Sequence, residues 1–195
     1  MQHIILASQS PRRKQLLEWA EVPFEVITAG TDESYPAGLT AEEVAVFIAK
    51  EKALAVREKI RQNFHHQHLG KPILAADTIV VIDEKIIGKP QDREEAMAIL
   101  QQLSGRKHKV ITGVVILHNE ADIVFADITE VSFHSLTKEQ LSYYVDQYQP
   151  YDKAGAYAIQ EWIGVVGIES INGDFYNVMG LPVSRVYQTL QQLAK

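Results

Sequence analysis

An aspartate interrupts an apolar stretch of the sequence. Residues 73–83 read ILAADTIVVID, which predicts a strand buried on both faces with Asp77 at its centre. An ionised carboxylate taken out of water without a partner costs several kcal/mol, so a cation must stand opposite it. If the strand turns at Asp83 and Glu84 and then returns, Lys89 of the sequence IIGKP arrives nearby. The two charges could form a simple buried ion pair, or a divalent cation and a polyphosphate could lie between them.

A second cation belongs to a predicted helix with the sequence AEEVAVFIAKEKALAVREK. When Ile48 and Ala55 are placed on the inner face, Lys52 falls within the apolar arc of this helix. The lysine either meets a buried partner, or its stem follows the apolar surface and carries the charge out to the rim. Glu33, in the turn-rich segment TDES, is by its position in a loop the best second carboxylate.

The segment ASQSPRR joins a predicted strand at residues 3–7 to a helix that begins at Pro11, with Ser10 as its N-cap. Backbone N–H groups and the positive end of the helix dipole would meet hydroxyl and guanidinium groups there, as in phosphate sites. The alternative is an ordinary capped helix with a basic, exposed first turn. The glycine-rich pattern of a P-loop is absent, which disfavours a kinase or GTPase of that type.

A fourth candidate stretch is YDKAGAYAIQ, at residues 151–160. Lys153 supplies a charge, Gly155 permits close approach of the backbone, and Gln160 offers the donor and the acceptor that reading a base edge requires. The alternative is a loop and strand whose glutamine is satisfied within the protein. From these residues alone both interpretations stay open.

The elements that must position these residues are interspersed along the chain. Strands are predicted at residues 3–7, 24–28, 73–83, 108–118 and 122–134. Helices are predicted at 11–20, 40–59, 92–103, 138–148 and 183–195. Capping boxes mark two of the helix starts, Thr40 with Glu43 and Asp92 with Glu95. This alternation predicts an α/β or α+β fold around a mixed sheet.

Three histidines lie close together in RQNFHHQHLGKP, at residues 61–72. His65, His66 and His68 share no helical face and are joined by no cysteine or carboxylate, so a metal site is disfavoured. We expect an exposed connection.

The composition limits the function. The chain has 195 residues, a net charge of −6 and no cysteine, which excludes disulfides, thiolate metal sites and a cysteine nucleophile. The acidic balance disfavours nucleic-acid binding, while scattered cations in small or apolar surroundings favour one small anionic ligand. No apolar stretch is long enough for a membrane span or a secretory signal, so a soluble cytoplasmic protein is expected.

Several motifs, taken together and in order, are similar to those of the Maf family of nucleoside triphosphate pyrophosphatases: LASQSPRRKQLL, ADTIV, GKP, LSGRKHKVITGV, YDKAGAYAIQ and NVMGLP. The resemblance spans nearly the whole chain. It implies one domain over residues 1–195, with an elongated α/β fold like that of the inosine triphosphate pyrophosphatases. In such a fold a mixed, strongly bent β-sheet is flanked by helices, and two lobes enclose a central cleft.

The resemblance also implies a reaction. A nucleoside triphosphate would be hydrolysed between its α and β phosphates to the monophosphate and pyrophosphate, with Mg²⁺ or Mn²⁺ as cofactor. The subgroup with these motifs prefers dTTP and UTP, and modified pyrimidine triphosphates are further candidates in a role of nucleotide-pool sanitation. Family habit implies a homodimer. The alternative is a non-catalytic nucleotide-binding regulator of cell division, given the family's association with septum formation.

Site residues are carried over by motif. Asp77 would be the proton acceptor and, with Glu33, would hold the metal, while Lys52 and Lys89 complete the catalytic set. The expected substrate-binding residues are Ser8, Arg12, Arg13, Thr78, Lys153 and Gln160. The one departure from the usual motif is Ala158, where the family usually has glycine.

Overall fold

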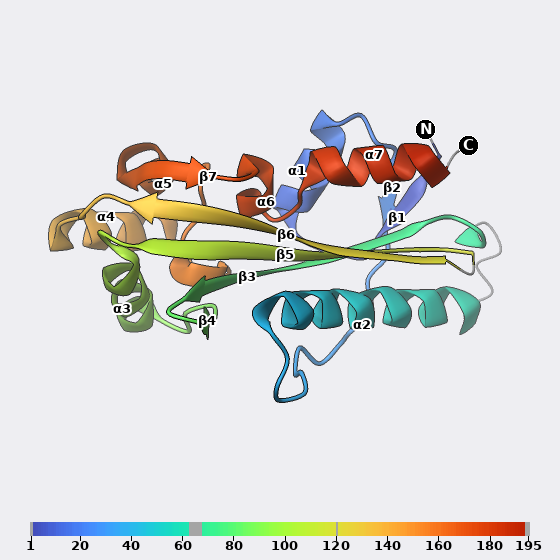
Figure 1. The fold of residues 1–195 in the computed structure, drawn as a ribbon, viewed down its shortest axis with the longest axis horizontal. Coiled ribbons are helices and arrows are strands. Elements are labelled where there is room, and N and C mark those ends of the chain that lie inside the picture. The colour runs from blue at the N-terminus through green and yellow to red at the C-terminus, as the bar shows by residue number, and fades with distance from the viewer. Residues whose placement is uncertain (1, 63–67, 120, 194–195) are drawn as a thin grey trace. The chain divides into compact units, whose positions relative to one another are not determined.

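The computed structural model describes residues 2–62, 68–119 and 121–193 (Figure 1). The strands are β1 (Ile4–Leu6), β2 (Phe24–Val26), β3 (Ile73–Ile82), β4 (Lys85–Ile87), β5 (Lys107–His118), β6 (Ala121–Phe133) and β7 (Ile168–Asn172). The helices are α1 (Pro11–Trp19), α2 (Ala41–Gln62), α3 (Arg93–Leu103), α4 (Lys138–Tyr148), the 3-10 turn η2 (Ala154–Ala156), α5 (Trp162–Gly167), α6 (Phe175–Met179) and α7 (Val183–Leu193).

The strands form one mixed sheet in the order β2-β1-β3-β5-β6-β7, with β4 paired to β3. Strand β1 runs parallel to both β2 and β3, whereas the pairs β3 with β4 and β6 with β7 are antiparallel. Helices flank this sheet, so the predicted α/β class with a mixed sheet and flanking helices is confirmed. The predicted strands 108–118 and 122–134 correspond to β5 and β6, which lie side by side in the sheet.

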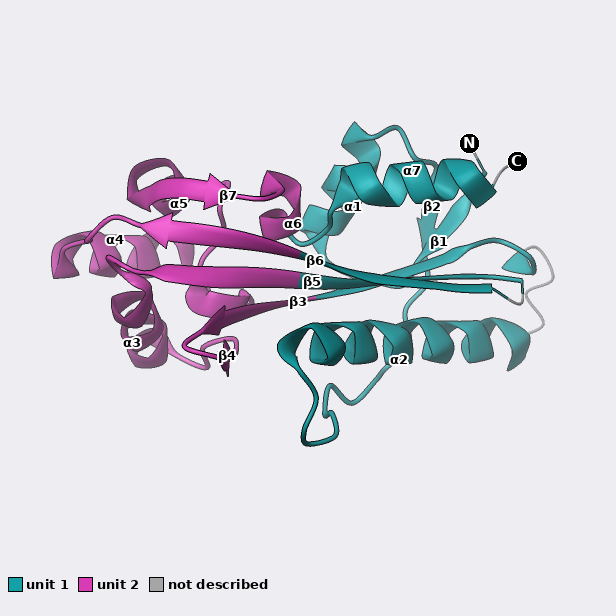
Figure 2. Cartoon of the chain, in the orientation of Figure 1, with its two compact units in different colours: residues 1–77, 112–127, 180–195 teal, residues 78–111, 128–179 magenta. Residues whose placement is uncertain are grey.

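The chain divides into two compact units (Figure 2). The first comprises residues 1–77, 112–127 and 180–195, and the second comprises residues 78–111 and 128–179. The division falls within β3, between Asp77 and Thr78. The single domain of two lobes with a central cleft stays a prediction.

In the first unit, α2 packs along the sheet through its small and β-branched residues (Figure 1). Ala49, Ala53 and Val56 join a core cluster with residues of β1, β3 and β5. The helix backbone approaches β5 so closely that a Cβ at Gly113 would lie 2.3 Å from the carbonyl carbon of Ala45. Only glycine permits this approach.

The start of α2 is fixed by the predicted capping box. The backbone N–H of Thr40 donates to the Glu43 carboxylate at 2.8 Å, and the backbone N–H of Glu43 donates to the Thr40 hydroxyl at 3.3 Å. The buried residues of α2 include Ala45, Ile48 and Ala49, while Ala55, expected on the inner face, is only half-buried.

The predicted hairpin forms in the second unit. Val80 pairs with Ile87, and the turn residues Asp83 and Glu84 both have positive φ, 47° and 63°. Helices α3 and α4 pack against each other in this unit. The sequence patterns had indicated neither α5 nor β7.

The structure describes only part of the histidine-rich connection at residues 61–72. His65 and His66 fall outside the described residues, whereas His68 is buried and bonds through Nδ1 to the Glu25 carboxylate at 2.8 Å. The expectation of an exposed connection is therefore wrong for His68. No helix in the described ranges has the length and the apolar character that crossing a membrane requires.

Candidate active site

The partner of Asp77 is Lys52. The ammonium Nζ of Lys52 donates to Asp77 Oδ1 at 2.7 Å and also lies 2.7 Å from Glu33 Oε1. The Lys52 and Asp77 side chains are 18% and 14% exposed, so this ion pair is largely shielded from water, whereas Glu33 is 51% exposed. Strand β3 carries the predicted interruption, since Asp77 and Thr78 are half-buried and the other eight residues of the strand are buried. Both carboxylates thus meet at one cation.

Helix α2 directs Lys52 to this place. Lys52 follows the buried Ile48 by four residues and precedes the buried Val56 by four, so it lies on the packed face. The alternative in which the lysine carries its charge to the rim is wrong, because the charge ends at two carboxylates.

The loop before α1 holds a buried arginine. Arg13 is 9% exposed, and its Nε donates to the carbonyl oxygen of Gly180 at 2.7 Å. Its Nη1 donates to the Ser8 hydroxyl at 3.1 Å, and the same hydroxyl accepts the backbone N–H of Ser10 at 3.2 Å. Ser10 takes the predicted N-cap place, but its side chain makes no capping bond. A wholly exposed basic first turn is therefore wrong, since Arg13 is buried and Arg12 is half-buried.

The buried Arg13 interacts electrostatically with the carboxylates around Lys52. Burial lowers the pKa of Arg13, because a desolvated guanidinium is less stable as a cation. The charges of Asp77 and Glu33 oppose this effect, and the neighbouring Arg12 adds to it. The first unit therefore gathers Arg12, Arg13 and Lys52 around two carboxylates, an excess of positive charge that suits a polyanion.

The motif YDKAGAYAIQ is tightly folded in the second unit. Gly155 has φ 70°, and a Cβ there would lie 2.8 Å from a methyl carbon of Val80. The Gly155 N–H donates to the carbonyl oxygen of Gly88 at 3.2 Å, which fastens the motif to the GKP segment that carries Lys89. Glycine is required here by both conformation and space.

Lys153 is held within this motif. Its side chain is 10% exposed and lies 2.8 Å from Asp152 and 3.6 Å from Glu161, measured between Nζ and carboxylate oxygens. The Tyr144 hydroxyl donates to Glu161 and accepts the backbone N–H of Ala158 at 3.2 Å. Sequence reasoning missed Tyr144 and Glu161, because no local pattern shows that a tyrosine of α4 meets this loop.

The other predicted residues of the second unit lie in more open surroundings. Thr78 is half-buried, and Lys89 and Gln160 are exposed. Within the motif, the Tyr157 hydroxyl lies 2.7 Å from Nε2 of the buried His108. Burial lowers the pKa of His108 to about 4 and raises the pKa of Tyr157, so both groups are neutral near pH 7.

A divalent cation fits the donors of the first unit. No cluster of three or more metal-ligating side chains occurs in the described part of the chain, so these residues provide no cage built from protein ligands alone. Asp77 and Glu33 do converge on one cation, Lys52. Mg²⁺ in proteins is usually coordinated by one or two carboxylates, and substrate phosphates and water complete its coordination.

Comparison with known proteins gives concordant matches. The model of the Maf family, described as Maf-like protein, matches residues 3–193. The dTTP/UTP pyrophosphatase of Bacteroides thetaiotaomicron is 47% identical over 191 residues, covering 97% of this chain and 95% of that protein. The dTTP/UTP pyrophosphatase of Porphyromonas gingivalis is 46% identical over 194 residues, covering 98% of this chain and 94% of that protein.

Among solved structures, the Staphylococcus aureus Ham1 protein aligns with a TM-score of 0.42 and 15% identity, covering 68% of this chain and 72% of that one. The family match and the similarity to the curated relatives extend over nearly the whole sequence. The chain therefore belongs to the Maf family.

Proposed function

We propose that the protein is a nucleoside triphosphate pyrophosphatase that hydrolyses dTTP and UTP to the monophosphate and pyrophosphate. The observation that carries the proposal is Lys52 held between Asp77 and Glu33, near the buried Arg13, in a chain whose close relatives bear the name dTTP/UTP pyrophosphatase. Modified pyrimidine triphosphates belong to the same proposed substrate class.

The triphosphate would be bound at the start of α1. Arg12 and Arg13 neutralise phosphate charge there, and the first N–H groups of the helix point toward the same place. Arg13 is oriented in advance by Gly180 and Ser8, so binding requires little reorganisation of its guanidinium.

Asp77 is the proposed proton acceptor for the water that attacks the α-phosphorus. Lys52 keeps this carboxylate in one orientation and neutralises it until substrate binds. A Mg²⁺ or Mn²⁺ ion held by Asp77 and Glu33 would supply charge neutralisation at the phosphates and polarise the water. Lys52 and Lys89 are proposed to stabilise the charge that develops on the leaving pyrophosphate.

Thr78, Lys153 and Gln160 are proposed to select the pyrimidine nucleotide. Lys153 is suited to recognition because Glu161 and Asp152 fix its position.

We also propose a cytoplasmic location, which agrees with the absence of cysteine. The homodimer stays a prediction, which sedimentation velocity tests.

The test is a pyrophosphate-release assay with dTTP, UTP, dCTP, CTP, ATP, GTP and 7-methyl-GTP, with and without Mg²⁺ or Mn²⁺. Turnover of dTTP and UTP in preference to the purine nucleotides is expected. Hydrolysis in ¹⁸O-water should place the label in the monophosphate, because water attacks the α-phosphorus. Nucleotide binding without turnover would instead favour the non-catalytic regulator, and label in pyrophosphate would contradict the proposed attack.

A further inference from the structure

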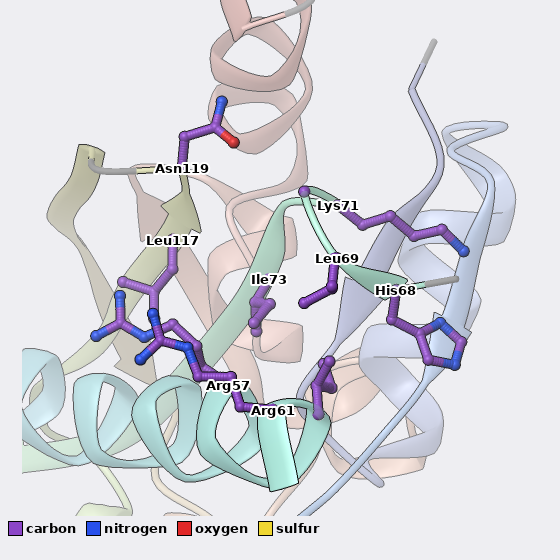
Figure 3. A pocket seen from close by; sticks show the side chains of 10 residues that line it. Arg57, Arg61, His68, Leu69, Lys71, Ile73, Leu117 and Asn119 are labelled. Carbon is purple, nitrogen blue, oxygen red and sulfur yellow. The ribbon is translucent and has the colours of Figure 1, made fainter. Parts of the chain in front are cut away.

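The first unit contains a cavity of about 200 Å³ at the C-terminal end of α2 (Figure 3). Its apolar part is formed by Ile60 of α2, Ile73 of β3 and Leu117 of β5, which are buried, and by Leu69, which is 56% exposed. Figure 3 shows Arg57 and Arg61 extending from α2 beside Leu117. An apolar pocket with a few polar groups at its edge is the usual form of a small-ligand site.

Two of the four cationic or titratable groups that line the cavity already bind one carboxylate. Lys71 Nζ donates to the Glu25 carboxylate at 2.7 Å, and His68 bonds to the same oxygen at 2.8 Å. Burial raises the pKa of Glu25, but the hydrogen bonds from Lys71 and His68 outweigh burial, so its pKa is lowered overall. Glu25 therefore remains a carboxylate near pH 7 and supplies a negative charge to Lys71 and His68 on this side of the cavity.

Arg57 and Arg61 differ from these two groups. Among the described residues no carboxylate lies within ion-pair distance of either guanidinium. They are spaced i, i+4 on α2, where two like charges disfavour the helix. A favourable interaction of Arg61 with the end of the helix dipole explains one cation. It does not explain a second cation one turn earlier, beside an apolar cavity.

This cavity is distinct from the candidate active site. Its lining shares no residue with the set around Asp77. Arg57 and Arg61 follow Lys52 by five and nine residues on the same helix. At the helical rise per residue, this places them about 7.5 Å and about 13.5 Å further along the axis.

We propose that the cavity binds a small amphipathic anion. A ring or short aliphatic body would contact Ile60, Leu69, Ile73 and Leu117, and a phosphate or carboxylate group would bind Arg57 and Arg61. The small volume limits the enclosed part of the ligand to a ring or a short chain, and the net charge of −6 disfavours a nucleic acid at this place.

The test uses phenyl phosphate, which combines a ring with a dianionic group, together with its two halves, inorganic phosphate and phenol. Amide signals of ¹⁵N-labelled protein are followed during titration. Phenyl phosphate should shift the amides of Leu69, Gly70 and Asn119 and bind about tenfold more tightly than either half. Binding of inorganic phosphate with equal affinity, or shifts confined to residues 8–14, would overturn the proposal.

Two variants locate the site. Arg57→Gln with Arg61→Gln should weaken phenyl phosphate binding about tenfold or more at the cavity amides, because both charge partners are removed. Leu69 is exposed, so Leu69→Ser should leave the core intact. This variant should weaken the binding of phenyl phosphate but not the binding of inorganic phosphate. Lys138→Gln, which removes an exposed charge in the second unit, is the matched control and should change nothing. Unchanged affinity in the double arginine variant would overturn the proposal.

Discussion

Replacing Lys52 by Met should destabilise the protein, and the size of the loss in stability should depend on whether Asp77 is present. The change removes the cation between two carboxylates while keeping a side chain of similar length. Removing one partner of a fully buried ion pair costs about 3–5 kcal/mol. Since Lys52 and Asp77 are 18% and 14% exposed and Glu33 is 51% exposed, water relieves part of that cost. We expect a loss of about 2–3 kcal/mol in the free energy of unfolding.

The coupling is measured by a double-mutant cycle in urea at pH 7. Asp77→Asn in the Lys52→Met background removes the carboxylate that has lost its partner, so the double variant should be more stable than Lys52→Met alone. An interaction free energy of about 1–3 kcal/mol is expected. Lys50→Met is the matched control on the same helix, because Lys50 pairs with Asp122 at 3.3 Å with both side chains over a third exposed. Its loss should stay below about 1 kcal/mol. Equal losses for the two lysines, or strictly additive effects of Lys52→Met and Asp77→Asn, would refute the reasoning.

Three further predictions concern stability. Tyr144→Phe removes the hydroxyl that joins Glu161 to the Ala158 N–H, and urea unfolding should show a loss of about 1–3 kcal/mol, whereas a negligible loss would contradict this role. Gly113→Ala brings a Cβ within 2.3 Å of the α2 backbone and should cost about 3 kcal/mol, and an unchanged melting temperature would show that the helix can yield. Because burial lowers the pKa of His108 from 6.5 to about 4, the unfolded chain binds the extra proton between these values. Stability should therefore fall as the pH drops from 6.5 toward 4, by up to about 3 kcal/mol, and His108→Gln should flatten this pH dependence.

The elements nearest the site could be predicted because their local patterns are strong. Strand β3 is apolar on both faces, which made Asp77 stand out, and the helix that carries Lys52 has both an apolar face and a capping box. Desolvation alone required a cation opposite Asp77. The helical face occupied by Lys52 made that lysine a candidate.

What the sequence could not predict depends on contacts between distant residues. The choice of Lys52 as the partner of Asp77 was open, because Lys89 was also a candidate. Arg13 is buried because the carbonyl oxygen of Gly180, 167 residues away in the chain, accepts its Nε–H. No local pattern contains that information.

The segment after Gln160 was missed for a local reason. Helix α5 contains Gly164 and Gly167, which disfavour a helix by propensity. A Cβ at Gly164 would lie 1.7 Å from the carbonyl oxygen of Ile159, so the close approach of the preceding turn requires glycine there. Strand β7 has only five residues, three of them polar, and it is defined by its pairing with β6 and not by its sequence.

The central claim is that Asp77 takes the proton from the attacking water, and Asp77→Asn tests it most directly. This variant keeps the shape and most of the hydrogen bonding of the side chain but removes the base. Pyrophosphate release from dTTP is measured in single turnover with the parent and the variant, and nucleotide binding is measured separately. We expect a fall in the rate of about 10²–10⁴-fold with nucleotide still bound. Release of pyrophosphate at the parent rate would contradict the claim.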